Sequence, residues 1–396
     1  MISQRISDIL QRGSAIRKAF QEAETLRVQY GAEQVFDLSL GNPSAPVPDT
    51  VQKAIHTVAE TELDHSYMAD AGYLWVRSRI AESLKSRMDV PYDADHILLT
   101  CGAAGALNVA LSALLDPGDE VIVLCPYYPA YRNFISNWQG VMMAVPCDDS
   151  FCPDLPALER AVSPRTKAVI LNSPNNPSGV IYSQALARRL TSILLEKQRE
   201  YGSTIFLISD EPYRELVYDG SALPVWAKLY PNSIMAYSFS KTLSVPGERI
   251  GYLALSPQAE ESRILMQAFR TTTGMLGYVN APAFFQRVIG MCLETSVDLQ
   301  YYARNRDTLY QALLHLGYEV TQPQGAFYLF VHAPDGDEEH FLQLARKHHL
   351  VFVGGSAFGC PGYVRLSFCG KHEMLERALP ALALLALDCN ISRTEE

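Results

Sequence analysis

A lysine lies at the start of a loop that follows a short apolar segment. Residues 233–237 are typical of a buried strand, and Ser238-Phe239-Ser240-Lys241 follows directly. Open α/β sheets carry their chemistry at such strand ends. A lysine that is partly removed from water there has a lowered pKa, so its amine can act as a nucleophile. A lone lysine in a polar loop is more often a solvated surface residue, so the neighbouring segments must decide between the two interpretations.

A turn of small residues lies between another predicted strand and a predicted helix. Gly102, Ala103 and Ala104 let backbone N–H groups approach an anion, and the dipole at the start of a helix favours negative charge. This turn is a candidate phosphate site, although it matches neither G-x-G-x-x-G nor a P-loop. Close packing of small residues explains it equally well.

Three further strand ends carry aromatic or polar residues. Tyr128 lies in an aromatic cluster, where its ring could stack on a flat heterocycle or pack in a corner. Asn176 belongs to the turn 172–179, whose composition is ordinary for a turn. Asp210 follows the wholly apolar run 205–208, and a carboxylate there needs a cation or hydrogen-bond donors.

These groups meet the requirements of one cofactor. Pyridoxal phosphate needs a lysine for its Schiff base, an acid for its pyridine nitrogen and a site for its phosphate. Lys241, Asp210 and the turn at 101–106 offer all three, and Arg249 adds a cation.

Five motifs, in this order, resemble the class I/II aminotransferases of the fold-type I pyridoxal-phosphate enzymes, the aspartate aminotransferase-like family. They are G-N-P at 41–43, S-P-N-N-P-S-G at 173–179, D-E-P-Y at 210–213, S-F-S-K at 238–241 and G-E-R-I-G at 247–251. The resemblance extends from about residue 36 to residue 368. Each motif alone is weakly specific, but the ordered set indicates the family.

The resemblance implies how the cofactor ring is held. Lys241 would form the internal aldimine and then move the proton between the substrate Cα and the cofactor. Asp210 would keep the ring nitrogen protonated, and Tyr213 and Asn176 would hydrogen-bond the phenolic oxygen. Tyr128 would stack on the ring.

The resemblance also implies the phosphate site. Ser238, Ser240 and Arg249 would bind the phosphate together with Gly102, Ala103 and Ala104. Tyr67 would reach the phosphate of the neighbouring subunit, so a homodimer with shared active sites is expected.

The implied substrates are an L-amino acid and a 2-oxo acid. Arg365, in V-R-L-S-F, would bind the α-carboxylate, because a bidentate guanidinium suits that group. Gly41 and Asn176 would also face the substrate.

Two departures from the family pattern concern specificity. Many relatives carry a hydroxyl residue at the position of Ala104, so one phosphate hydrogen bond is expected to be missing. The segment 271–278 has no arginine of the kind that dicarboxylate-specific members use, which argues against a dedicated aspartate enzyme.

The order of segments predicts an α/β protein. Short apolar runs separated by helix-length segments predict a seven-stranded, mainly parallel sheet between helices, with a smaller α+β domain after it. The runs are 97–101, 121–125, 141–145, 168–172, 205–209, 234–237 and 250–255. The predicted parts are an N-terminal arm and helix joining the small domain (1–47), a large cofactor-binding domain (48–296) and a small C-terminal domain with a linking helix (297–396).

Composition excludes several classes of protein. A net charge of −10 argues against nucleic-acid and anionic membrane surfaces, and no apolar run reaches the length of a membrane span. The eight cysteines include no C-x-x-C pair, and the N-terminus lacks a signal-peptide core, so we expect reduced thiols and a cytoplasmic protein. The histidines near residue 345 lack metal-ligand spacing, and we expect no metal.

The preferred hypothesis is a pyridoxal-phosphate-dependent aminotransferase (EC 2.6.1.-). An enzyme of β- or γ-elimination, such as a carbon–sulfur lyase or a cyclopropane-carboxylate synthase, would use the same Lys241, Asp210 and Arg365. A non-catalytic regulator is disfavoured because the segment before Gly41 leaves no room for a DNA-binding domain. A nicotinamide oxidoreductase lacks its fingerprint.

Overall fold

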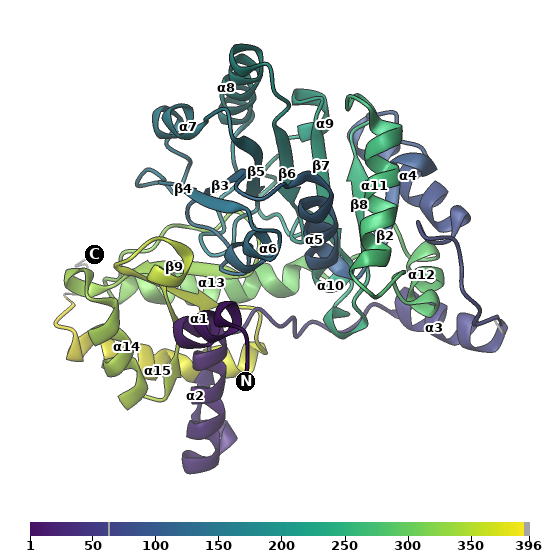
Figure 1. Cartoon of the computed structure of the whole chain (residues 1–396). Coiled ribbons are helices and arrows are strands. Elements are labelled where there is room, and N and C mark those ends of the chain that lie inside the picture. The colour runs from purple at the N-terminus through teal and green to yellow at the C-terminus, as the bar shows by residue number, and fades with distance from the viewer. Residues whose placement is uncertain (62–63, 392–396) are drawn as a thin grey trace.

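A seven-stranded sheet forms the centre of the larger part of the molecule (Figure 1). The computed structural model describes residues 1–61 and 64–391. Residues 62–63 of the predicted large domain and 392–396 of the predicted C-terminal domain lie outside the described residues. The strand order is β2-β8-β7-β6-β5-β3-β4, and β8 alone among the seven runs opposite to the others. The seven-stranded, mainly parallel sheet is therefore confirmed.

All seven strands correspond to predicted apolar runs, with ends shifted by a residue or two. Their bounds are β2 (Ile97–Thr100), β3 (Glu120–Leu124), β4 (Val141–Val145), β5 (Thr166–Asn172), β6 (Phe206–Asp210), β7 (Ser233–Ser238) and β8 (Gly251–Leu255). Successive residues of β3 are buried in two different hydrophobic cores, one on each face of the sheet. Val121 and Val123 pack toward α5 (Gly102–Leu114) and α11 (Ser262–Met275), whereas Ile122 packs toward α7 (Leu155–Ala161) and α8 (Gln184–Tyr201). Because both faces are covered, the strands are apolar throughout.

Three helices cover β2 and β8, at one end of the sheet. They are α3 (Asp49–Thr61), α4 (Leu74–Met88) and α12 (Ala283–Gly290), and they share a third core with Leu99 and Tyr252. Shorter helices fill the remaining connections: α6 (Tyr131–Asn137), α9 (Trp226–Leu229) and α10 (Phe239–Thr242). No helix in the described ranges is long and apolar enough to cross a membrane.

The smaller part of the molecule has a core of its own, below the sheet in Figure 1. It combines α13 (Leu299–His315), α14 (Glu338–Lys347) and α15 (His372–Asp388) with the antiparallel sheet β11 (Val353–Gly354), β12 (Tyr363–Ser367) and β9 (Tyr328–His332). This part is α+β, as the sequence predicts.

The N-terminal segment joins this smaller part. β1 (Phe36–Asp37) pairs in parallel with β10 (Leu350–Val351), and α2 (Ala15–Tyr30) runs beside them. The alternation of apolar and polar residues at 35–40 predicts a short strand, and this prediction is wrong in length, because only two residues find a partner strand. These contacts support the division at 47/48 and 296/297, which we retain as a proposal.

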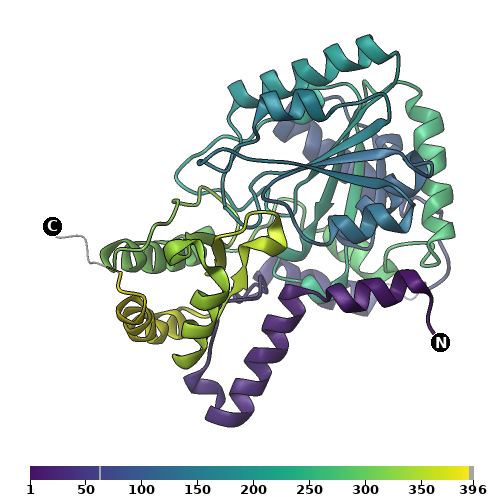
Figure 2. The ribbon, with the colours of Figure 1, turned by 60° about the vertical axis from the view of Figure 1, so that its left-hand side comes forward.

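An unpredicted helix, α1 (Gln4–Arg12), precedes α2. Ser3 caps it by accepting from Ile6 N, and Gly13 ends it with φ of 66°. In Figure 2, α1 lies along the larger part, whereas α2 extends away from it along the smaller part. Arg5 donates to Asn137 Oδ1 at 2.9 Å, which ties α1 to α6.

Glycine at position 251 is required by the packing of β8. A Cβ there would lie 2.2 Å from the Tyr237 carbonyl oxygen and 2.8 Å from the Gly102 Cα. We expect Gly251→Ala to lower the free energy of unfolding by about 1–3 kcal/mol, because the backbone must move to admit the methyl group. Urea denaturation measures this loss. Gly247→Ala is the matched control, since a Cβ at Gly247 meets no atom within 4 Å; equal midpoints for both variants would contradict the prediction.

Candidate active site

The strand ends that carry the predicted residues meet at one edge of the central sheet. In the strand pairing, Asn172 lies opposite Asp210, and Ser238 and Thr100 both lie opposite Gly251. β8 runs the other way, so its start, just after Arg249, lies at this same edge. Neighbouring strands thus bring residues far apart in the sequence to one place.

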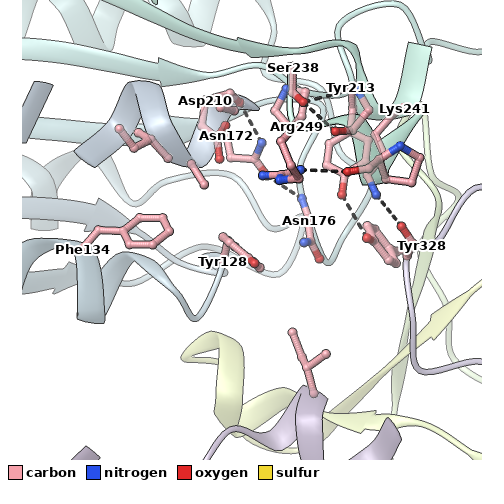
Figure 3. A pocket seen from close by; sticks show the side chains of 18 of the residues that line it. Tyr128, Phe134, Asn172, Asn176, Asp210, Tyr213, Ser238, Lys241, Arg249 and Tyr328 are labelled. Carbon is pink, nitrogen blue, oxygen red and sulfur yellow. Dashed lines mark hydrogen bonds between the residues drawn. The ribbon is translucent and has the colours of Figure 1, made fainter. Parts of the chain in front are cut away.

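A cavity of about 260 Å³ opens at this edge, between the sheet and the smaller part (Figure 3). Most of the predicted site residues line it: Gly41, Ala103, Ala104, Tyr128, Asn176, Asp210, Tyr213, Ser238, Ser240, Lys241, Arg249 and Arg365. Figure 3 shows Lys241, Tyr213 and Tyr328 together at one end, with Phe134 toward the other. The structure therefore gathers almost the whole predicted set around one cavity.

Lys241 lies in the short helix α10, one residue after Ser240. Its Nζ donates to the Gly41 carbonyl oxygen at 2.5 Å and lies 6.0 Å from the centre of the Phe327 ring. Burial lowers the pKa of Lys241 to about 8, and the positive charges of Arg365 and Arg249 act in the same direction. The shift increases the fraction of neutral amine near neutral pH, and the neutral form is the one that a nucleophile or base requires.

Asp210 is buried at the end of β6, with 5% of its surface exposed. Tyr131 donates to Oδ2 at 2.5 Å, while Oδ1 is buried without a hydrogen-bond partner among the described residues. Burial raises the pKa of Asp210 to about 7, and the Tyr131 hydrogen bond opposes this shift. An unpaired buried carboxylate oxygen is costly, so Oδ1 is well placed to accept from a ligand N–H.

A cradle for an anion lies where α5 begins. Cys101, which precedes the helix, gives no side-chain cap, so the first N–H groups are open to a ligand. Gly102 has φ of +74°, and a Cβ there would lie 3.1 Å from Arg249 Nη2 and 3.5 Å from Ser238 Oγ. Arg249 is exposed and donates only to the carbonyls of Pro246 and Cys101 in its described hydrogen bonds. Two hydroxyls complete the cradle, because Ser238 Oγ donates to Ser240 Oγ at 2.8 Å.

Arg365 is a second cation at the cavity, buried in β12 with 2% of its surface exposed. Nη1 donates to Asn176 Oδ1 at 2.9 Å and Nη2 to the Ser39 carbonyl at 2.5 Å, whereas Nε lacks a partner among the described residues. The guanidinium lies over the rings of Tyr328 and Phe358, 4.4 and 4.9 Å from their centres. No described carboxylate balances this buried cation, so it is suited to a carboxylate ligand.

Two tyrosines form one wall. Tyr213 Oη and Tyr328 Oη lie 2.9 Å apart, and burial raises the pKa of both phenols, so both remain protonated at neutral pH. Gly41 is necessary here because a Cβ would lie 1.9 Å from Tyr328 Oη. The backbone of Gly41 therefore lies close to Tyr328, and its carbonyl oxygen accepts from Lys241 Nζ.

Tyr67, a predicted site residue, lies away from the cavity. Its side chain is 94% exposed, and it does not line the cavity of its own chain. This position leaves its predicted role across a subunit interface untested.

Several residues in or beside the cavity were not predicted from sequence. Tyr131 holds Asp210, Tyr328 holds Tyr213, and Ile16 of α2, Leu107 of α5 and Phe134 of α6 are apolar walls. Tyr131 belongs to the same aromatic cluster as Tyr128, but the sequence of this cluster does not indicate which of its side chains contacts Asp210. Ile16 comes from a helix without any chemical signal.

The fold places a lysine with a lowered pKa in a cavity that also contains groups suited to an anion. Residues 33–382 match the sequence family described as aminotransferase class I and II. The chain therefore belongs to this family and is an aminotransferase. Enzymes of this family use pyridoxal phosphate.

Related proteins match over nearly the whole chain. The aspartate aminotransferase of Thermotoga maritima is 32% identical, over 96% of this chain and 97% of that protein. A probable aspartate/prephenate aminotransferase of Thermus aquaticus is 30% identical, with 91% and 94% covered.

Solved structures show the same fold. A crystal structure of an aminotransferase from Eubacterium rectale has a TM-score of 0.94 at 38% identity and covers 98% of this chain and 100% of that one. The aspartate aminotransferase from Thermus thermophilus with maleate has a TM-score of 0.87 at 27% identity, with 97% and 99% covered.

The raised pKa of Asp210 makes stability depend on pH in the cofactor-free protein. Between pH 4 and 7 the unfolded chain loses this proton while the folded protein retains it, so rising pH weakens folding. Asp210→Asn removes this dependence. We expect the free energy of unfolding of the variant, minus that of the wild type, to increase by about 2–3 kcal/mol between pH 5 and pH 7.5.

Urea denaturation at the two pH values measures the difference. Lys241, whose pKa is lowered to about 8, contributes to both proteins, so its titration cancels in the difference between wild type and variant. Asp89→Asn is the control, since that carboxyl is 94% exposed and its pKa is lowered by Lys228. A constant difference between wild type and Asp210→Asn would contradict the prediction.

Proposed function

We propose that the chain is a pyridoxal-phosphate-dependent aminotransferase that moves an amino group from an L-amino acid to a 2-oxo acid. One observation carries the proposal. A lysine amine with a lowered pKa lies in a cavity that also holds an unpartnered carboxylate oxygen, an unpartnered guanidinium nitrogen and an anion cradle. When bound, the cofactor supplies an electrophilic aldehyde for the amino group and an electron-withdrawing ring that acidifies the substrate Cα–H.

The residues present fit this cofactor. Asp210 Oδ1 would accept the N–H of the pyridine ring, and Tyr128 would lie against the ring face. Ser238, Ser240 and Arg249, with the backbone from Gly102 to Ala104, would hold the phosphate. The missing hydroxyl at Ala104 leaves the backbone N–H groups and Arg249 as the main donors.

The remaining side chains would handle the substrate. Arg365 would bind the α-carboxylate, using the Nε that has no partner in the described chain. Lys241 Nζ would take the proton from the substrate Cα and return it elsewhere, which its lowered pKa permits. Tyr213 and Asn176 would hold the phenolic oxygen, with Tyr328 fixing the direction of the Tyr213 hydroxyl.

We further propose a cytoplasmic homodimer with shared active sites. Support comes from the exposed Tyr67 and from exposed apolar side chains close to it in sequence, Leu74 and Trp75, 62% and 43% exposed. An apolar surface of this kind is suited to a subunit interface. The eight free thiols are compatible with a reducing compartment.

Elimination remains the second hypothesis, because Lys241, Asp210 and Arg365 would serve both reactions. The products separate the two. Transamination requires a 2-oxo acid acceptor and conserves the amino group, whereas β-elimination releases pyruvate and ammonia without any acceptor.

The test is to add L-amino acids one at a time to cofactor-loaded protein, without a 2-oxo acid. For a true donor we expect the visible absorption band to fall and a near-ultraviolet band to rise, and a 2-oxo acid added afterwards to restore the first band. Lys241→Ala should show no such change and should lose at least about 10⁴-fold in turnover. Accumulation of pyruvate and ammonia from the wild type under a persistent visible band would instead identify a lyase.

Subunit mixing tests the shared site. We expect Tyr67→Phe to weaken cofactor retention about tenfold, because a hydrogen bond to a charged group is lost. Mixed with inactive Lys241→Ala subunits, it should regain activity at limiting cofactor, since each hybrid dimer contains one site with both Lys241 and Tyr67. Tyr30→Phe, at a second exposed tyrosine, should behave as wild type. A strictly monomeric active protein, or no gain at any mixing ratio, would refute the shared site.

A further inference from the structure

Four of the eight free cysteines gather where the central sheet meets the smaller part. Cys147, just after β4, and Cys360, just before β12, are 213 residues apart in sequence, yet their Sγ atoms lie 3.8 Å apart. Cys125 lies close by, because a Cβ on Gly359 would be 3.1 Å from its Sγ. Cys152 belongs to the same turn as Cys147, closed by the hydrogen bond from Asp148 N to the Cys152 carbonyl at 2.8 Å.

We propose that Cys147 and Cys360 are a site of reversible oxidation, at which a hydroperoxide converts the two thiols into a disulfide that links β4 to the loop before β12. The sulfurs must approach from 3.8 Å to about 2 Å to form the bond. Cys147 is half-buried, so a small peroxide can reach it, whereas Cys360 is buried.

The two thiols differ in character. A hydrogen bond joins the two thiols, and it lowers the pKa of the Cys147 thiol, although burial and the neighbouring Asp148 and Asp149 act the other way. The same hydrogen bond and burial raise the pKa of Cys360. Because Cys147 is also the more accessible of the two, it is the thiol that meets the peroxide, and the buried Cys360 is the resolving thiol.

The reaction balances with hydrogen peroxide as the oxidant. The Cys147 thiolate attacks one peroxide oxygen, the O–O bond breaks, and protonation of the leaving hydroxide gives a sulfenic acid and water. The sulfur of Cys360 then attacks the sulfur of Cys147 as the S–O bond breaks, and the thiol proton leaves with the hydroxide as a second water. Two thiols and one peroxide give one disulfide and two waters; a dithiol reductant reverses the oxidation.

The link would act on the carboxylate-binding arginine. Between Gly354 and Cys360, the turn Gly355–Phe358 places the Phe358 ring 4.9 Å from the Arg365 guanidinium. Tyr127 N donates to the Phe358 carbonyl at 3.0 Å, so this loop already contacts the larger part. A covalent bond at Cys360 would fix this wall of the cavity, and any effect on turnover rests on the proposed role of Arg365.

Peptide mapping tests the site without reference to activity. The cofactor-loaded, full-length protein is treated with hydrogen peroxide, blocked with N-ethylmaleimide and digested with trypsin. We expect peptides 133–160 and 348–365 to be linked, with fragment ions that assign Cys147 and not Cys152. Cys147→Ser and Cys360→Ser should abolish the link, and the matched control Cys152→Ser should retain it. No link, or a link through Cys125 or Cys152, would overturn the proposal.

Two further readouts test the consequence. Hydrogen–deuterium exchange of residues 355–365 should slow in the oxidised protein, whether or not the chain proves to be an aminotransferase. With a donor identified, kcat/KM should fall about fivefold on oxidation and recover with dithiothreitol, while Cys147→Ser should lose nothing. Unchanged exchange in a fully linked protein would overturn the claim that the bond fixes the loop. The expected linkage and slowed exchange, with no turnover in either state, would count against the proposed function alone.

Discussion

The active-site cavity depends on the burial of charged groups that the protein itself does not neutralise. Asp210 Oδ1 and Arg365 Nε are buried without partners in the described chain, and the Lys241 amine donates only to a backbone carbonyl among its described contacts. Such burial costs free energy. It persists because the surrounding fold leaves these side chains no other position, and the cost is recovered when a ligand of complementary charge binds.

The central sheet provides that rigidity. Asp210 and Ser238 end neighbouring parallel strands whose residues are buried on both faces, so neither can move without disturbing two cores. Gly251 and Gly102 allow β8 and the start of α5 to approach closely, which sets the anion cradle against Arg249. Arg365 comes instead from the smaller part, and its distance from Lys241 is therefore set by the packing between the two parts.

The sequence contained enough to predict the sheet and most of the site. Strands buried on both faces appear as unbroken apolar runs, and the residues after parallel strands must share one edge. It did not contain the pairings across long separations. Tyr131 reaches Asp210 over 79 residues and Tyr328 reaches Tyr213 over 115, and no local pattern distinguishes these phenols from other buried tyrosines. β1 was predicted too long for a similar reason, because its length is decided by β10. α1 was missed because its composition is polar.

Burial acts on the two titrating groups of the cavity in opposite senses. It raises the pKa of Asp210 to about 7 and lowers that of Lys241 to about 8, so both move toward their neutral forms near physiological pH. A ligand N–H cation at Asp210 would restore the carboxylate, because an opposite charge favours the ionised form. At Lys241, burial and the positive charges of Arg365 and Arg249 lower the pKa of the amine, and Cys369 opposes them. A cationic ligand would therefore favour the ionised form of Asp210, whereas burial favours the neutral form of the Lys241 amine. Both positions follow from where the strands of the central sheet end.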